Sequence, residues 1–233
     1  MSIRVTFENQ LGMLTDQLVY LSSMTDRALD KAMRALIEQD TALASEVVRE
    51  DAEINRLRYR IEEHAYQLLA TQQPMARDLR NIAASISIAT NMERMADHAS
   101  GIAILAHRMA HEPPLKPLVD IPRMGEIGRE MLRDSIQAFL DRNEELAQEV
   151  AARDQLLNQL NEQVLRELLT HMVEGPSSIR RGTYLIWVSH NLERWGDRVK
   201  NICERVVYIV SGKLKDFDYD TLDEADVPAD TRE

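Results

Sequence analysis

The stretch Asn91-Met92-Glu93-Arg94-Met95-Ala96-Asp97 has a second copy later in the chain, Asn191-Leu192-Glu193-Arg194-Trp195-Gly196-Asp197. Asparagine, glutamate, arginine and aspartate coincide in the two copies, and their residue numbers differ by 100. A second pattern upstream is also doubled, because the spacing of Val47, Asp51 and Asn55 recurs as Val150, Asp154 and Asn158. We therefore expect the chain to consist of two similar units.

Each unit has the apolar periodicity of long helices. In the first thirty residues, for example, leucines recur at intervals of three and four, which places them on one helical face. We predict six helices, over residues 6–37, 41–70, 74–110, 123–140, 144–173 and 176–210. Asp40 and Asn143 are expected to be N-caps, and Pro74 and Pro176 are expected to open helices.

A proline-rich segment separates the two units. Three prolines between residues 113 and 117 cannot continue a helix. We predict a first three-helix bundle over residues 1–111, a linker over 112–122, a second bundle over 123–212 and an acidic, disordered tail over 213–233. Helices of about 30 residues joined by short links pack antiparallel, so the predicted fold is all-α, with two tandem three-helix bundles.

Composition excludes several classes of function. The chain has 233 residues and a formal net charge of −11, which argues against nucleic acid as a partner. Its single cysteine, Cys203, allows neither an internal disulfide nor a thiolate metal cage. No apolar run reaches the roughly 20 residues that span a bilayer, and the first residues lack an apolar leader. We therefore expect a cytoplasmic protein without membrane insertion.

The doubled motif carries paired carboxylates. Glu93 and Asp97 lie four residues apart on one helix face, as do Glu193 and Asp197 in the second copy. An aspartate, Asp51 or Asp154, interrupts the apolar seam of the preceding helix in each unit, and neighbouring helices would bring it to the pair. Carboxylates that converge without thiols suit hard or borderline cations such as magnesium, manganese or iron.

A structural reading of the same residues stays open. Arg94 and Arg194 lie inside the motifs, and Arg80 and Arg180 lie upstream, so the acids could form salt bridges that hold the bundles together. His98 follows Asp97 directly, so it could join the site as an outer ligand or hydrogen-bond donor. No glutamate is followed by a histidine three residues later, so the signature of di-iron oxidase bundles is missing.

The sequence contains no catalytic signature. Phosphate-binding loops, dinucleotide-binding loops, nucleophile elbows and zinc-protease motifs are all absent from it. We expect a protein that is not an enzyme. Two alternatives remain, a metal-dependent enzyme built on the carboxylates and a purely structural helical scaffold.

Together these motifs resemble those of the PhoU family. The resemblance rests on the two E-R-x-x-D motifs, on residues 73–80 (Gln-Pro-Met-Ala-Arg-Asp-Leu-Arg) and on residues 201–204 (Asn-Ile-Cys-Glu), and it extends from about residue 8 to residue 212. The first motif departs from the family pattern, which often has glycine before the aspartate and arginine after it. The second unit also has Ser178 where the first has Asp78, so the two sites are expected to differ.

The resemblance implies a fold of two three-helix bundles and a role as negative regulator of phosphate uptake and of the phosphate-starvation response. It implies an adaptor between the ATPase subunit of a phosphate ABC transporter and a sensor histidine kinase. We also expect a homodimer. Some family members hold metal clusters at these motifs. Carried over by position, the metal ligands would be the following residues: Glu93, Asp97, Glu193, Asp197, Asp51, Asp154 and Asp78.

Overall fold

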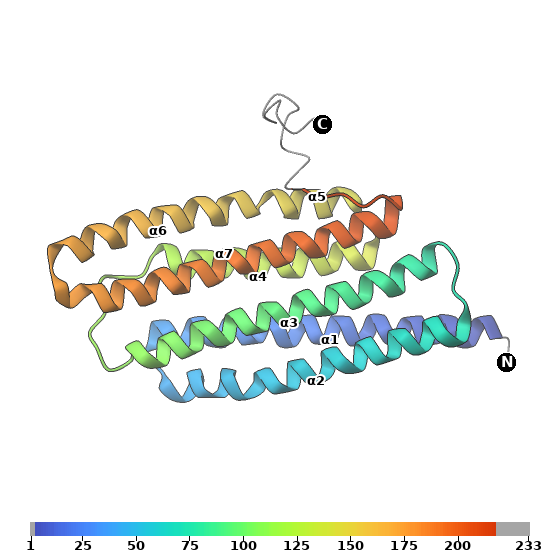
Figure 1. Cartoon of the computed structure of the whole chain (residues 1–233), viewed down its shortest axis with the longest axis horizontal. Coiled ribbons are helices and arrows are strands. Elements are labelled where there is room, and N and C mark those ends of the chain that lie inside the picture. Colours follow the sequence, from blue (N-terminus) through green and yellow to red (C-terminus); the bar gives the residue numbers. More distant parts are fainter. Residues whose placement is uncertain (1–2, 218–233) are drawn as a thin grey trace, which may run out of the picture.

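The computed structural model describes residues 3–217, which are helical along almost their whole length and contain no strand. The helices are α1 (Ile3–Glu38), α2 (Thr41–Gln72), α3 (Arg77–Met109), α4 (Asp120–Asp141), α5 (Glu144–Ala152), α6 (Asp154–Glu174) and α7 (Pro176–Ser211) (Figure 1). The predicted all-α class is confirmed. The predicted tail lies mostly in residues 218–233, outside the described residues.

The fifth predicted helix is divided at Arg153 into α5 and α6. The Arg153 N–H donates to the Val150 carbonyl at 3.1 Å, and the Leu156 N–H donates to the Arg153 carbonyl at 3.0 Å. Both bonds span three residues instead of four, which tightens the helix locally. The break makes Asp154 the first residue of α6.

Most of the predicted helix starts are confirmed. The Asp40 carboxylate accepts hydrogen bonds from the N–H groups of Ala42 and Leu43, both at 2.9 Å, and so caps α2. The side chain of Asn143 caps α5 in the same way, and Pro176 is the first residue of α7. These residues satisfy or avoid the unpaired N–H groups of a first helical turn.

Two proline predictions were displaced by a few residues. Pro74 precedes α3 without opening it, because Ala76 has a φ of 47° that no helical residue adopts, and α3 starts at Arg77. Pro122 was expected to precede the fourth helix but lies within the first turn of α4, which starts at Asp120. A proline is tolerated there because the first-turn N–H groups have no partner inside the helix.

The helices form two bundles that meet through α3 and α7. Helices α1, α2 and α3 pack on one another, and α7 packs against α4, α5 and α6. Figure 1 shows α3 and α7 side by side and running in opposite directions between the remaining helices of the two bundles. The exact domain boundaries proposed from the sequence stay a prediction.

The contact between α3 and α7 is reciprocal. His98 Nδ1 lies 3.1 Å from Asn191 Oδ1, and the Asn201 side chain donates to Asn91 Oδ1 at 3.4 Å. A Cβ at Gly101 would lie 3.2 Å from Asn191 Oδ1, so this glycine lets the helices approach. Equivalent positions of the two copies thus contact one another across an approximate two-fold relation, which places both repeated motifs at the centre of the molecule.

Helices α1 and α4 add a second connection between the bundles. The guanidinium of Arg129 donates to both carboxylate oxygens of Asp26, at 2.9 and 3.0 Å, and to Asp30 Oδ1 at 2.5 Å. Within the second bundle, the buried indole of Trp195 donates to the Gly128 carbonyl at 2.9 Å. None of the described helices is both long and apolar enough for a membrane span.

Candidate functional site

The first carboxylate cluster forms where α2 packs against α3, and it consists of Asp51, Glu93 and Asp97. Burial raises the pKa of Asp51, and the negative charges of Asp97 and Glu93 raise it further. The three carboxylates therefore interact electrostatically, and their convergence into one ligand set stays a prediction. The Asn55 side chain donates to Asp51 Oδ2 at 3.2 Å and holds its orientation.

Two oxygens of the first cluster are buried without a hydrogen bond. These are Asp51 Oδ1 and Glu93 Oε2. Arg94 forms ion pairs with this cluster, and its guanidinium lies 3.6 Å from Glu93 Oε2 and 3.4 Å from Asp97 Oδ2. The Arg94 side chain is 60% exposed, so water weakens its compensation of the buried charge. Burying an uncompensated carboxylate is costly, which favours a bound cation at this place.

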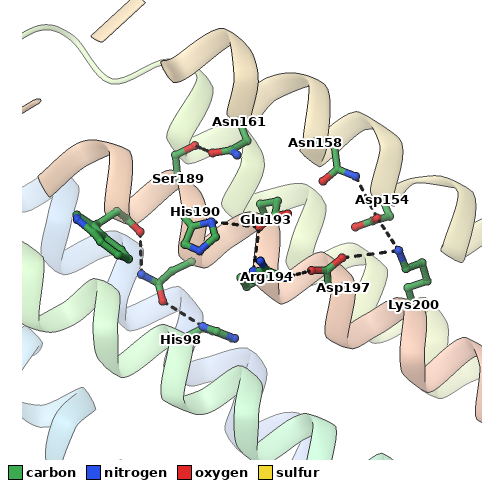
Figure 2. Close-up of polar contacts among 12 residues, drawn as sticks. His98, Asp154, Asn158, Asn161, Ser189, His190, Glu193, Arg194, Asp197 and Lys200 are labelled. Atoms are coloured by element: carbon green, nitrogen blue, oxygen red, sulfur yellow. Dashed lines mark hydrogen bonds and ion pairs between the residues drawn. The ribbon is translucent and has the colours of Figure 1, made fainter. Parts of the chain in front are cut away.

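The second cluster repeats this arrangement with Asp154 of α6 and with Glu193 and Asp197 of α7 (Figure 2). Asn158 donates to Asp154 Oδ2 at 3.3 Å, as Asn55 does in the first cluster. Burial raises the pKa of Glu193, with a further contribution from Asp197. Asp154 Oδ1 and Glu193 Oε2 are again buried without a hydrogen bond.

The second cluster contains basic side chains that the first lacks. Lys200 Nζ lies 3.4 Å from Asp154 Oδ2 and 3.7 Å from Asp197 Oδ1, and His190 Nδ1 lies 3.3 Å from Glu193 Oε2 (Figure 2). Burial raises the pKa of Asp154, and the positive charge of Lys200 opposes that rise. Lys200 was not among the residues predicted from the sequence. Comparing the two copies would have revealed it, because the equivalent residue is Ser100.

Asp78 is not part of the first cluster. It lies in the first turn of α3, fifteen residues before Glu93, which corresponds to about 22 Å along a helix axis. A carboxylate there interacts favourably with the partial positive charge of the helix N-terminus. Its counterpart Ser178 lies in the first turn of α7, and its hydroxyl contacts the carbonyls of His171 and Gly175.

Some of the motif acids form the salt bridges that the structural interpretation of the sequence predicts. Arg194 Nη1 donates to Asp197 Oδ2 at 3.1 Å, as Arg94 does to Asp97, so both motif arginines pair within their own helix. Arg180 instead pairs with Glu112 of the linker. His98, which was considered as a companion of Asp97, contacts Asn191 of the other bundle.

The donor chemistry of the clusters suits a hard cation. Carboxylate oxygens are the ligands that magnesium, manganese and calcium prefer, and four carboxylate oxygens of the two clusters are buried without a hydrogen bond. Within residues 3–217, however, no three histidine, cysteine, aspartate or glutamate side chains are already close enough to hold a metal ion. Metal binding would therefore require side-chain movements, and the metal hypothesis stays a prediction.

Comparison with known proteins agrees with the duplicated fold. The model of the PhoU domain matches the chain twice, over residues 18–106 and 121–206. A phosphate-specific transport system accessory protein PhoU homolog from Clostridium acetobutylicum is 35% identical, covering 92% of this chain and 98% of its own length. A homolog of the same description from Aquifex aeolicus is 37% identical, covering 85% of this chain and 90% of its own length.

Two solved structures share the fold. The crystal structure of PhoU from Pseudomonas aeruginosa is 32% identical, with a TM-score of 0.85, and covers 89% of this chain and 100% of that one. The phosphate transport system regulatory protein PhoU from Streptococcus pneumoniae is 29% identical, with a TM-score of 0.84, and covers 91% of this chain and 100% of that one. Two matched domains, two bundles and relatives of matching length lead to one assignment: the chain belongs to the PhoU family.

Proposed function

We propose that this protein is an accessory regulator of phosphate uptake that represses the phosphate-starvation response while phosphate is plentiful. The observation that carries this proposal is the shared description of its relatives, which are named phosphate-specific transport system accessory proteins and align over most of both chains. The proposed mechanism is that of an adaptor between the transporter's ATPase subunit and a sensor histidine kinase. Its site of action would be the cytoplasm, where both partners expose soluble domains.

An apolar strip on α6 and α7 supports an adaptor role. Leu165, Leu169 and Val173 recur every four residues along α6, and they are 40%, 49% and 89% exposed. Trp187 of α7 is 54% exposed and lines the same shallow hollow as Leu165. Exposed apolar side chains that gather on one face are typical of protein contact surfaces. We propose that this strip contacts the ATPase subunit or the kinase.

A reporter strain tests the regulatory role. Deleting the gene should derepress a starvation-induced phosphatase reporter in high phosphate, and the wild-type gene should restore repression. A variant carrying Leu169→Ala and Trp187→Ala should fail to restore it. The matched control replaces Tyr59 and Tyr66 by alanine, because these side chains are 62% and 53% exposed on α2 of the other bundle. Repression that persists without the gene would contradict the regulatory proposal.

Direct binding tests the proposed partners. Purified protein should form a complex with the ATPase subunit and with the cytoplasmic part of the kinase, measured by light scattering after size exclusion. The same measurement on the protein alone tests the expected homodimer. A protein that binds neither partner, alone or together, would favour the structural-scaffold alternative.

We also propose that the first carboxylate cluster holds a divalent or iron-type cation. The supporting observation is that Asp51 Oδ1 and Glu93 Oε2 are buried without a hydrogen bond. Elemental mass spectrometry should find metal in the wild type and not in a variant with alanine at Glu93, Asp97, Glu193 and Asp197. Phosphate-ester hydrolysis with added manganese that disappears in Glu93→Ala would instead revive the enzyme alternative.

A further inference from the structure

The chain that follows α7 turns back over the second bundle. Figure 1 shows this return segment, residues 213–217, passing over α5. The Phe217 N–H donates to Glu204 Oε1 of α7 at 3.2 Å, and the Phe217 ring packs against the core. Phe217 lines one hollow together with Gln148 and Ala151 of α5. A short non-helical segment with an aromatic residue therefore covers the groove between α5 and α7.

The equivalent segment of the first bundle takes a different course. The two motifs differ by 100 in residue number, so residues 113–117 correspond to the return segment, and they belong to the proline-rich linker. Arg181 of α7 donates to the Pro113 carbonyl at 2.7 Å and so holds the linker against the second bundle. The linker is therefore not available to cover the equivalent groove of the first bundle, which lies between α2 and α3.

The groove between α2 and α3 is open and partly apolar. It contains a hollow of about 250 Å³, which Val48 and Ile104 line. Both side chains are 41% exposed. They correspond to Ala151 and Glu204, which lie beside Phe217 in the second bundle. A cavity of about 150 Å³ can hold a benzene ring, so this hollow has room for one aromatic side chain.

The ionisable side chains that line the open groove are both basic. His107 and Arg108 lie in the last turn of α3, and neither forms an ion pair with another side chain of residues 3–217. The corresponding residues of the second bundle, Val207 and Tyr208, have no basic group. The first bundle thus adds a basic edge to an apolar groove, and charge complementarity favours an acidic occupant.

We propose that the groove between α2 and α3 binds a non-helical segment of a partner protein, in which an aromatic side chain lies next to acidic residues. The return segment is the internal precedent, because Asp216 precedes Phe217 and the ring of Phe217 lines the equivalent groove. The partner's aromatic ring packs on Val48 and Ile104, and its acids pair with Arg108. This surface is separate from the strip on α6 and α7, and the inference does not depend on which system the protein regulates.

A peptide with the sequence of residues 214–220, Leu-Lys-Asp-Phe-Asp-Tyr-Asp, tests the proposal. Labelled with a fluorophore and titrated with the full-length chain, it should bind saturably at one site per chain, measured by fluorescence polarisation. The same peptide with alanine at both aromatic positions should not bind. Ile104→Asp should weaken binding by about tenfold or more, because it places a carboxylate in the apolar contact. Arg108→Glu should also weaken binding, and more so at low salt than at high salt.

Leu165→Asp is the matched control, because Leu165 is 40% exposed on α6 of the other bundle, and the peptide should bind this variant as it binds the wild type. Circular dichroism establishes that each variant is folded, and Arg108→Glu decides the question if Ile104→Asp is not. Absence of saturable binding, or unchanged affinity in the folded groove variants, would overturn the proposal. Light scattering tests the competing occupant. A wild-type dimer that Ile104→Asp converts to a monomer would mean that a second copy of this chain fills the groove, which would also overturn it.

Discussion

Asp154 and Gly196 approach so closely that a methyl group at residue 196 would lie 2.5 Å from the Asp154 carboxylate. Asp154 is the first residue of α6, and Gly196 lies in the middle of α7, next to the motif residue Asp197. The contact fixes the carboxylate of the second cluster against the helix that carries the other two acids. Glycine is therefore required here for close approach and not for an unusual backbone angle.

Gly196→Ala is expected to destabilise the protein by about 1–3 kcal/mol, the usual cost of overpacking a core. Both neighbours of the added methyl group, Asp154 and Leu157, are held within the bundle and cannot move freely. The measurement is the free energy of unfolding from urea denaturation. Gly12→Ala in α1 is the matched control, because nothing lies within 4 Å of its Cβ position. Gly12→Ala should stabilise the protein by up to about 1 kcal/mol. Equal effects of the two substitutions on the unfolding free energy would contradict the packing argument.

Arg129→Ala should weaken the connection between the bundles. Its guanidinium is 26% exposed and pairs with two carboxylates of α1, so we expect a loss of about 1–2 kcal/mol in unfolding free energy. A double-mutant cycle with Asp26→Ala isolates the pairwise coupling. Arg166→Ala is the control, since Arg166 and its partner Glu162 are 69% and 71% exposed and should contribute less than about 0.5 kcal/mol. A coupling of zero would mean that packing alone joins α1 to α4.

The reactivity of the Cys203 thiol reports how often the core around α7 opens. Cys203 is fully buried, so a reagent cannot reach its sulfur in the folded state. Burial also raises the pKa of the thiol, which disfavours the reactive thiolate. A disulfide reagent such as dithionitrobenzoate should react with the native protein only as fast as the core opens. In denaturant the same thiol should react completely and quickly. Because this is the only cysteine, the rate belongs to one site, and rapid reaction of the native protein would exclude the packing described.

Much of the fold could be predicted from the sequence because helical periodicity, caps and prolines are local signals. Asp40 and Asn143 cap helices as expected, and the linker separates the two copies. The break at Arg153 had no such signal, since no glycine or proline marks it and the tightened turn forms by backbone bonding alone. Pro74 was misplaced because Ala76 has a φ of 47°, which no helical residue adopts, so that α3 begins only after it.

The acidic residues of the candidate site could be predicted from the sequence, but the basic residues that contact them could not all be. A carboxylate that interrupts an apolar seam indicated that Asp51 and Asp154 would meet the motif on the next helix. The difference between the clusters depends on Lys200, whose distance to Asp154 is set by how α6 packs on α7. The sequence also did not predict how deeply each aspartate is buried. The apolar seam alone does not distinguish the partly exposed Asp51 from the fully buried Asp154.

Glu204 should make the stability of the protein depend on pH. It is 8% exposed, and burial raises the pKa of its carboxyl above the ordinary value of 4.5, although the N–H of Phe217 donates to it at 3.2 Å. A raised carboxyl pKa favours the folded state below the unfolded pKa, and that contribution is lost as pH rises through the folded pKa. The unfolding free energy of the wild type should therefore fall, relative to Glu204→Gln, between about pH 4.5 and neutrality. Urea denaturation of both proteins across this range measures the difference. Glu162→Gln, at a 71% exposed glutamate of α6, should show no such trend. A difference between wild type and Glu204→Gln that stays constant with pH would mean that the carboxyl is solvated in the native state.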